Sequence, residues 1–370
     1  MIVQSAPKAR LGPVDEDQPP QVRVPAPLRL RLDANALCDN WRTLARMSGP
    51  AACGAAVKAD GYGLGSSAVI GHLIKAGCRD FFVATWAEAA SVDHHFRRSE
   101  ASLSVLHGLR PEDVPAAGAS AARPVLNTAS QIRLWRDCGG GPCDVMVDTG
   151  FNRLGLSLKE VTEGVLDGLS VETLMSHLAS ADEDSVLNAA QRIAFESYFA
   201  RVAAKRYSLA NSAGIALGKS YSFDLTRPGI ALYGGVPRAE FAKVIKPIVT
   251  PEAQVLQRKQ VPTGSTVGYN AAWTATRPTE IAILNIGYAD GYAPVFSAGG
   301  QARTGEQRLP VIGRVSMDLL AIDVSLAPEI AESDWLALDY PLASSSRLSG
   351  RSQYELLVGL SDRFDRVWVT

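Results

Sequence analysis

Short apolar runs alternate with amphipathic stretches over the first two thirds of the chain. Eight apolar runs have the length of strands, namely Ala51–Val57, Phe81–Ala84, Leu103–Leu106, Pro124–Leu126, Val145–Val147, Glu172–Met175, Tyr207–Ala210 and Phe223–Leu225. Stretches with helical periodicity separate them, as at Ser67–Ala76, Trp86–His95, Ser130–Cys138 and Leu187–Ala204. Alternation of strands and helices indicates a parallel sheet. Eight such runs predict an α/β fold with a (β/α)8 TIM barrel, and a doubly wound open sheet is the alternative.

The pattern changes after about Lys246, where helical periodicity fades and threonine, proline and alternating β-branched residues become frequent. Examples of this alternation are Gln254–Val261, Glu280–Ile286, Leu309–Val315 and Leu319–Val324. It indicates a separate, mostly β domain. We therefore expect a disordered or extended arm over residues 1–27, a barrel domain over 28–246 and a C-terminal β domain over 247–370.

Composition and charge narrow the class of protein. The chain has 370 residues, 20% of them charged, and a net charge of −1, so no charged surface predicts nucleic acid or a membrane as partner. The cysteines number five, and none forms a CxxC pair, so neither a disulfide framework nor a metal site is expected. No apolar stretch has the form of a signal peptide or the length of a membrane span, which predicts a cytoplasmic location.

Polar side chains follow several of the predicted strands, where a parallel barrel carries its chemistry. They are Lys58, Arg153, His177, Asn211 with Ser212, and the segment 227–230. A lysine that leaves a buried strand can have a lowered pKa and attack a carbonyl. Taken singly, each residue also has an ordinary interpretation, such as a solvated lysine, a core histidine or a helix cap. Their gathering at one rim predicts a small-molecule site.

Eight segments, in order along the chain, resemble the motifs of the alanine racemases. They are Ala56–Gly65, Val147–Gly155, Ser176–Asp182, Ala210–Ala213, Thr226–Gly234, Val267–Asn270, Ile286–Tyr292 and Gly313–Asp318. Each motif alone is weak evidence for the family. Eight motifs in the same order make the resemblance specific, and it extends from about residue 28 to the end. The resemblance implies a barrel followed by a β domain, pyridoxal 5'-phosphate as cofactor, a head-to-tail homodimer with shared active sites, and racemisation of alanine.

The resemblance also implies a role for each matching position. Lys58 would carry the cofactor as a Schiff base and act as one catalytic base, and Tyr269 of the other subunit would act as the second. The cofactor phosphate would be held by Tyr62, Asn211, Ser212, Gly229 and Ile230. Arg227 would face the pyridine nitrogen, with His177 bonded behind it. Arg153 and the backbone of Met317 would contact the substrate carboxylate or the phenolic oxygen, and Tyr288 and Asp290 would line the entrance.

Racemisation removes the α-proton from one face and returns it to the other, so two bases are expected. An arginine beside the pyridine nitrogen would disfavour protonation of that nitrogen and weaken the electron sink. We expect the D-alanine formed to supply peptidoglycan.

Three positions depart from the resemblance. Met146 stands where many relatives have a lysine that is often carbamylated, which leaves open how Arg153 is held. Asp362 stands where some relatives have a phosphate-contacting tyrosine, and Ser316 replaces a common cysteine.

Three other functions compete with this interpretation. A decarboxylase of basic amino acids shares the fold but needs a cysteine in the β domain, whereas all five cysteines here precede residue 150. A broad-specificity racemase and a non-catalytic pyridoxal-phosphate-binding protein remain as alternatives at this point.

Overall fold

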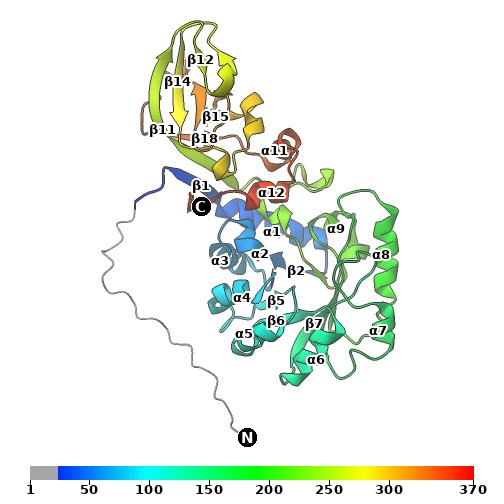
Figure 1. Ribbon diagram of the computed structural model, residues 1–370. Helices are drawn as coiled ribbons and strands as arrows, with labels where there is room; N and C mark the ends of the chain where they lie inside the picture. Colours follow the sequence, from blue (N-terminus) through cyan, green and yellow to red (C-terminus); the bar gives the residue numbers. More distant parts are fainter. Residues whose placement is uncertain (1–23) are drawn as a thin grey trace, which may run out of the picture.

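The computed structural model describes residues 24–370, so nearly all of the arm predicted over residues 1–27 lies outside the described residues. Figure 1 shows a lobe of alternating strands and helices, with a second, β-rich lobe standing on one side of it. The first lobe holds strands β2 to β10. The second lobe holds β11 (Val249–Val261) and most of the chain that follows it.

The first lobe is the predicted parallel barrel, and the expected fold class is confirmed. Seven strands follow one another in the order β3-β4-β5-β6-β7-β8-β9, and β10 pairs in parallel with β2. Backbone hydrogen bonds from Asp224 to Tyr207 (3.0 Å) and from Arg227 to Ala210 (2.8 Å) join β10 to the β9 side. The strands are β2 (Ala52–Cys53), β3 (Ala55–Ala56), β4 (Asp80–Val83), β5 (Ser102–Val105), β6 (Arg123–Leu126), β7 (Pro142–Met146), β8 (Ser170–Met175), β9 (Arg206–Ser208) and β10 (Leu225–Thr226).

Gly54 divides the first barrel strand into β2 and β3. A Cβ atom at this position would lie 2.8 Å from the backbone oxygen of Asp80 and 2.9 Å from the ring of Phe82. Only glycine allows such a close approach of two neighbouring strands. The single apolar run predicted over Ala51–Val57 is therefore one strand with a glycine bend.

Helices between the strands cover the outside of the barrel. Many begin at a side-chain cap, for example Thr85 and Glu88, which form a reciprocal capping box. The helices are α1 (Ala34–Ser48), α2 (Lys58–Tyr62), α3 (Ser66–Ala76), α4 (Trp86–Val92), α5 (Val114–Ala119), α6 (Ala129–Asp137), α7 (Leu158–Thr162), α8 (Val186–Glu196), α9 (Ser212–Ala216) and α10 (Lys219–Ser222), with 3-10 turns η1 (Asp93–His95), η2 (Pro111–Asp113), η3 (Ile230–Tyr233) and η4 (Ala239–Phe241).

The second lobe is built on an antiparallel sheet. Its strand order is β14-β17-β16-β15-β18-β11-β1-β19, and an additional pairing of β14 with β11 closes part of it into a barrel. The long strand β11 makes this closure possible, because its first half pairs with β18 and its second half with β14. The elements are β12 (Thr266–Val267), η5 (Tyr269–Ala271), β13 (Trp273–Thr274), β14 (Thr279–Leu284), η6 (Tyr288–Asp290), η7 (Pro294–Ala298), β15 (Gln301–Thr304), β16 (Gln307–Ile312), β17 (Leu320–Asp323), β18 (Trp335–Leu338), α11 (Leu342–Ser349), α12 (Gln353–Val358) and β19 (Asp365–Val369).

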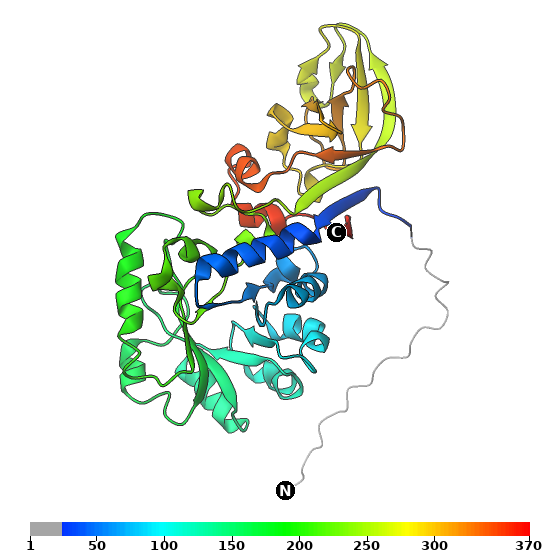
Figure 2. The ribbon, with the colours of Figure 1, turned by 180° about the vertical axis from the view of Figure 1, so that it is seen from behind.

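The first described strand, β1 (Leu28–Asp33), differs from the domain boundaries drawn on the sequence. Those boundaries assigned it to the barrel, but it pairs with β11 and β19 in the sheet of the second lobe. Its alternating leucines are buried in that sheet, and Asp33 then caps α1. Figure 2 shows α1 continuing from β1 along the barrel. The N-terminal segment therefore joins the two lobes.

Two contacts of the C-terminal segment bring α12 and β19 against α2. The Nε atom of Arg366 donates to the backbone oxygen of Gly63 (2.8 Å), and a Cβ at Gly63 would lie 3.1 Å from the backbone oxygen of Leu357. The C-terminal segment is thus held beside the turn that begins at Lys58.

Within residues 24–370, no helix has the length and apolar character needed to cross a membrane. The five cysteines all lie in this part of the chain, and each is a free thiol.

Replacing Leu30 by alanine tests the role of β1. The side chain is 0% exposed, so we expect the change to lower the free energy of unfolding by about 2–5 kcal/mol through lost burial and a residual cavity. The matched control is Leu326→Ala, because Leu326 is 74% exposed and should change stability by less than about 0.5 kcal/mol. Urea denaturation measures both, and equal stability of the two variants would argue against β1 as a core strand.

Candidate active site

Lys58 lies at the end of the first barrel strand, at the start of an unusual turn. Ala59, Asp60 and Tyr62 have positive φ angles of 52°, 50° and 58°, so α2 is a left-handed turn. Each such non-glycine residue costs about 1–2 kcal/mol, so surrounding contacts must hold the turn. The carboxylate of Glu88 accepts the Ala59 N–H (2.8 Å), and Asp60 accepts the N–H and hydroxyl of Ser66. This turn brings Lys58 and Tyr62 to the same rim.

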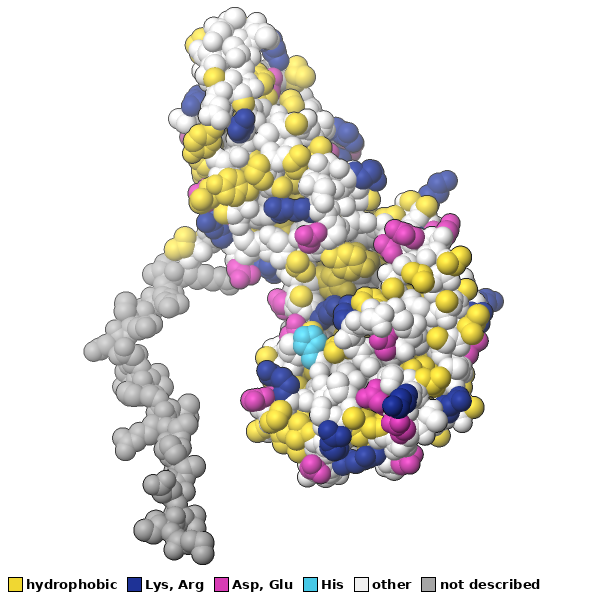
Figure 3. Space-filling model, turned by 45° about the vertical axis from the view of Figure 1, so that its right-hand side comes forward, with side chains coloured by type: hydrophobic (Ala, Val, Ile, Leu, Met, Phe, Trp, Pro, Cys, Tyr) yellow, Lys and Arg dark blue, Asp and Glu magenta, His cyan; other side chains and the backbone are white. Residues whose placement is uncertain are grey.

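A cavity of about 270 Å³ opens at the carboxyl ends of the barrel strands. It brings together four of the predicted site residues, and its lining includes Lys58, Arg153, His177 and Arg227 together with Met146. Figure 3 shows the molecule hollowed between the two lobes, with hydrophobic side chains gathered there. Three of these groups carry positive charge, and within residues 24–370 none of the three forms an ion pair.

Burial and mutual repulsion lower the pKa of several groups in this cavity. Desolvation by the surrounding protein lowers the pKa of Lys58, and the positive charge of Arg153 lowers it further, although Lys58 is exposed at the cavity mouth of the single chain. Desolvation, followed by the charges of Arg227, Arg153 and Lys58, lowers the pKa of His177 to about 3. Burial lowers the pKa of Arg227 to about 10, so it remains charged at neutral pH. The site holds cations beside a neutral imidazole.

The partners of Arg227 differ from the expected contact with His177. One guanidinium nitrogen of Arg227 donates to the backbone oxygen of Ser176 (2.5 Å), and the other donates to the hydroxyl of Ser208. The imidazole of His177 lies instead beside Phe151, with ring centroids 5.7 Å apart. The adjacent strand ends β8 and β9 hold Arg227, because they place a carbonyl and a hydroxyl within its reach.

The predicted phosphate residues form a second group beside Lys58. Tyr62 stacks on Tyr233 with centroids 4.5 Å apart, and a Cβ at Gly229 would lie 2.1 Å from the Tyr62 hydroxyl oxygen. The hydroxyl of Ser212 accepts the Gly229 N–H (2.8 Å). Within the described residues, the N–H of Ile230 and the hydroxyl of Tyr62 donate no hydrogen bond. Two donors with no acceptor among the described residues thus meet beside Gly229, so this cradle fits an anion such as a phosphate.

Asn211 keeps its ordinary structural role in this chain. Its side-chain oxygen accepts the N–H of Gly214 (2.9 Å) and caps α9. The cap also orients Ser212 toward Gly229, so the Asn211-Ser212 pair serves both the helix and the cradle.

Tyr354 is a site residue that the sequence did not predict. The centroid of its ring lies 6.2 Å from the centroid of the Tyr62 ring. Burial is the main cause that raises the pKa of Tyr354, so the phenol stays protonated at neutral pH. Ser352 and Glu355 form a capping box that indicates a helix start here, but no local pattern reveals that this helix packs on α2. Asp362, the position compared with a phosphate-contacting tyrosine, is fully exposed and lies 3.8 Å from Arg366.

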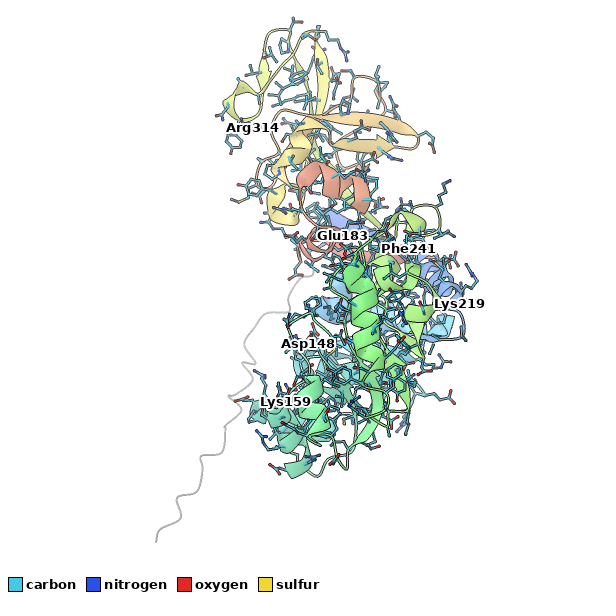
Figure 4. The ribbon with its side chains drawn as sticks, turned by 90° about the vertical axis from the view of Figure 1, so that its right-hand side faces the viewer. Asp148, Lys159, Glu183, Lys219, Phe241 and Arg314 are labelled. Atoms are coloured by element: carbon cyan, nitrogen blue, oxygen red, sulfur yellow. The ribbon has the colours of Figure 1, made fainter. Side chains whose placement is uncertain are left out.

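The remaining predicted residues lie on the second lobe, away from the Lys58 cavity. Tyr269 and Met317 are 68% and 52% exposed and line a separate hollow with Tyr288 and Arg314. Figure 4 shows Arg314 in the β-rich lobe, far from Asp148 on the barrel. Within the described residues, the Met317 N–H donates to no group, while its carbonyl accepts the Ala289 N–H (3.0 Å). A single chain therefore does not bring Tyr269 to Lys58.

Asp290, expected with Tyr288 to line the entrance, is buried within its own chain. Its side chain is 1% exposed and accepts hydrogen bonds from the Gly287 N–H (3.0 Å) and the Ser361 hydroxyl (3.2 Å). Arg363 also approaches it. The Asp290 carboxylate stabilises the 287–291 turn. Tyr288, in contrast, lines the hollow that also contains Tyr269.

Comparison with known proteins identifies the family. Models described as the alanine racemase N-terminal domain and the alanine racemase C-terminal domain match residues 32–237 and 248–368. The chain belongs to the alanine racemase family. The predicted alanine racemase activity is thereby confirmed, and the decarboxylase and binding-protein alternatives are set aside.

Relatives and solved structures agree with this family. An alanine racemase of Methylobacterium nodulans is 41% identical over 92% of this chain and 96% of its own length. The catabolic and biosynthetic alanine racemases of Agrobacterium fabrum are 40% and 38% identical over 92% and 93% of this chain and 92% and 94% of their own lengths. The crystal structure of alanine racemase from Bartonella henselae with covalently bound pyridoxal phosphate has a TM-score of 0.84 and 33% identity, and it covers 93% of this chain and 100% of that chain.

The low pKa of His177 predicts a loss of stability in acid. The unfolded imidazole binds a proton below a pKa of about 6.5, whereas the native one stays neutral down to about 3. The unfolded state therefore holds more protons between these values, and stability falls as the pH drops through this window. From pH 7 to pH 5, the His177 contribution should decrease by about 2 kcal/mol.

Urea denaturation of the cofactor-free protein at pH 7 and pH 5 measures this loss. The variant His177→Gln should lose about 2 kcal/mol less than the parent between the two pH values. His94→Gln is the control, because His94 is exposed outside the cavity, and it should behave as the parent does. An unchanged acid loss in His177→Gln would contradict the neutral, desolvated state of His177.

Proposed function

We propose that this chain racemises alanine in a site built by two subunits, with pyridoxal 5'-phosphate bound at the barrel rim. The observation that supports this most directly is the separation of Lys58 from Tyr269 and Met317, which lie exposed on the other lobe. A second copy arranged head to tail would bring the Tyr269 surface of one chain to the Lys58 cavity of the other.

The residues present fit the proposed cofactor. Tyr62, Ser212 and the N–H of Ile230 suit its phosphate, because donors that have no acceptor among the described residues converge beside Gly229. Lys58 suits attachment to an aldehyde, since its lowered pKa leaves more of the amine neutral. When bound, pyridoxal phosphate withdraws electrons from the substrate α-carbon.

The substrate carboxylate would be held by Arg153 and by the backbone N–H of Met317 from the partner subunit. Arg153 lines the cavity of Lys58 and, within residues 24–370, neither its guanidinium donors nor the Met317 N–H have an acceptor. These donors would fix the α-carbon between Lys58 and the partner subunit's Tyr269. One base on each face lets the α-proton leave from one side and return on the other.

Arg227 would lie against the pyridine nitrogen and keep its own proton there. Its pKa of about 10 makes it a permanent donor at neutral pH, and Ser176 and Ser208 fix its position. A fixed cation disfavours protonation of that nitrogen and so limits how much charge leaves the α-carbon. We therefore assign the return of the proton to bases that are already held close to the α-carbon and can reprotonate it rapidly. The destination of the D-alanine in peptidoglycan stays a prediction.

Replacing Tyr269 by phenylalanine tests the assignment of one base to each face. The variant should slow exchange of the α-proton for deuterium from one enantiomer of alanine by about 100-fold or more, because the base on that face is lost. Exchange from the other enantiomer, which Lys58 serves, should change much less. Exchange is followed by mass spectrometry with each enantiomer separately. Equal slowing for both enantiomers would contradict the assignment of a different base to each face.

Replacing Gly229 by alanine tests the phosphate cradle. The new methyl group would displace the Tyr62 hydroxyl, and we expect the dissociation constant for pyridoxal phosphate to rise about 10-fold or more. Gly118→Ala is the matched control, since a methyl group there meets no atom within 4 Å. Titration of the cofactor-free proteins, followed by absorbance, compares the two. Equal affinities would remove Gly229 and Tyr62 from the phosphate site.

A further inference from the structure

The loop after β7 holds two side chains toward the Lys58 cavity, and its backbone is firmly anchored. One carboxylate oxygen of Asp148 accepts the N–H groups of Gly150, Phe151 and Asn152 at 2.9–3.1 Å. The hydroxyl of Tyr198 donates to the backbone oxygen of Asp148 (3.0 Å). Since Asn152 lies between Phe151 and Arg153 in a left-handed conformation, the chain turns so that these two side chains meet.

Among the described residues, the guanidinium of Arg153 has one partner, the ring of Phe151. The guanidinium carbon lies 4.1 Å from the centre of the Phe151 ring. Within residues 24–370, Arg153 donates no hydrogen bond and forms no ion pair. Met146, at the end of β7 and on the same cavity wall, is uncharged and offers no anion. An aromatic face is therefore the contact that orients this cation.

An aromatic ring and a carboxylate hold an arginine in different ways. A carboxylate binds the edge of the guanidinium and occupies two of its N–H donors. A ring binds the flat face, so all five N–H donors remain available in the plane. For a residue that must receive a substrate carboxylate, the second arrangement combines a fixed position with full binding capacity.

Phe151 also connects Arg153 with the rest of the cavity. Its ring lies 5.7 Å from the imidazole of His177 at an angle of 59°, so the three groups follow one another along the wall. The charge of Arg153 contributes to the lowered pKa of both Lys58 and His177, which is consistent with a fixed position close to both. His177 is neutral and so does not compete for the electron-rich ring face.

We propose that Phe151 is the positioning residue for Arg153: its ring face holds the guanidinium over the cavity in place of an anionic partner and leaves the donors free for the substrate carboxylate. This inference rests on the proposed role of Arg153. Phe151 itself touches no reacting atom, so its effect on catalysis must pass through Arg153.

Replacing Phe151 by leucine tests the ring face. Phe151→Leu keeps an apolar side chain but removes the π-system, and KM for L- and D-alanine should rise about 3- to 30-fold with a smaller change in kcat. Phe151→Trp retains a ring face and should keep KM within about 3-fold of the parent. Phe199→Leu is the matched control, because Phe199 packs among Phe195, Tyr207 and Phe223 and has no contact with Arg153.

The double variant separates this inference from the proposed function. Arg153→Ala should raise KM strongly, and Phe151→Leu should add no further increase in that background, because the ring then has no cation to hold. If Arg153→Ala leaves KM unchanged, the assigned role of Arg153 fails. If Arg153→Ala raises KM but Phe151→Leu does not, the proposed function stands and the role of Phe151 is overturned. Additive effects of the two changes would overturn it as well.

A chemical probe tests the contact without catalysis. Phenylglyoxal modifies arginine side chains, and mass spectrometry of peptides reports the rate at Arg153 in the cofactor-free protein. We expect faster modification of Arg153 in Phe151→Leu than in the parent or Phe151→Trp, since the ring no longer covers one face. The rate in Phe199→Leu should equal that of the parent. Equal rates in all four proteins would show that the ring does not hold the guanidinium.

Discussion

Positive charge without an ion-pair partner among the described residues is the constraint around which this site is built. Lys58, Arg153 and Arg227 converge at one rim of the barrel, and within the described residues no carboxylate pairs with any of them. Unpaired cations close together are costly, so the fold must hold them by other means. Arg227 is held by a carbonyl and a hydroxyl, Arg153 by the Phe151 ring, and Lys58 by a left-handed turn. The arrangement is suited to an anionic cofactor and a carboxylate substrate.

The second lobe also carries polar groups that lack a partner among the described residues. Among residues 24–370 the Met317 N–H has no acceptor and Tyr269 is mostly exposed, although the turns that carry them are closely packed. Gly287 lies so close to Met317 that a Cβ there would meet its carbonyl oxygen at 2.3 Å, and a Cβ at Gly268 would approach the Arg314 nitrogen at 3.1 Å. Rigid backbones that present unused donors are typical of a surface prepared for a partner. Both features fit the proposed site, in which a second chain would supply Tyr269 and Met317.

The barrel was predictable from sequence because apolar runs and helical periods are local features, and each of the eight runs overlaps a barrel strand, although Phe223–Leu225 shares only Leu225 with β10. The partner of β1 was not predictable, because pairing of the N-terminal strand with β11 and β19 depends on contacts between distant parts of the chain. Tyr354 was missed for the same reason, since its contact with Tyr62 joins α12 to α2, two elements from opposite ends of the chain. The buried position of Asp290 followed from the fold of the 287–291 turn, which a motif does not specify.

The most direct test of the shared site uses two inactive variants, Lys58→Ala and Tyr269→Phe, carried on differently tagged chains. A hybrid dimer purified through both tags has one site that lacks both residues and one intact site that takes Lys58 from one chain and Tyr269 from the other. We predict that this hybrid racemises alanine at about half the wild-type rate per dimer, while each parent variant remains inactive. If the hybrid is as inactive as its parents, Lys58 and Tyr269 act from the same chain, and the two-subunit site is contradicted.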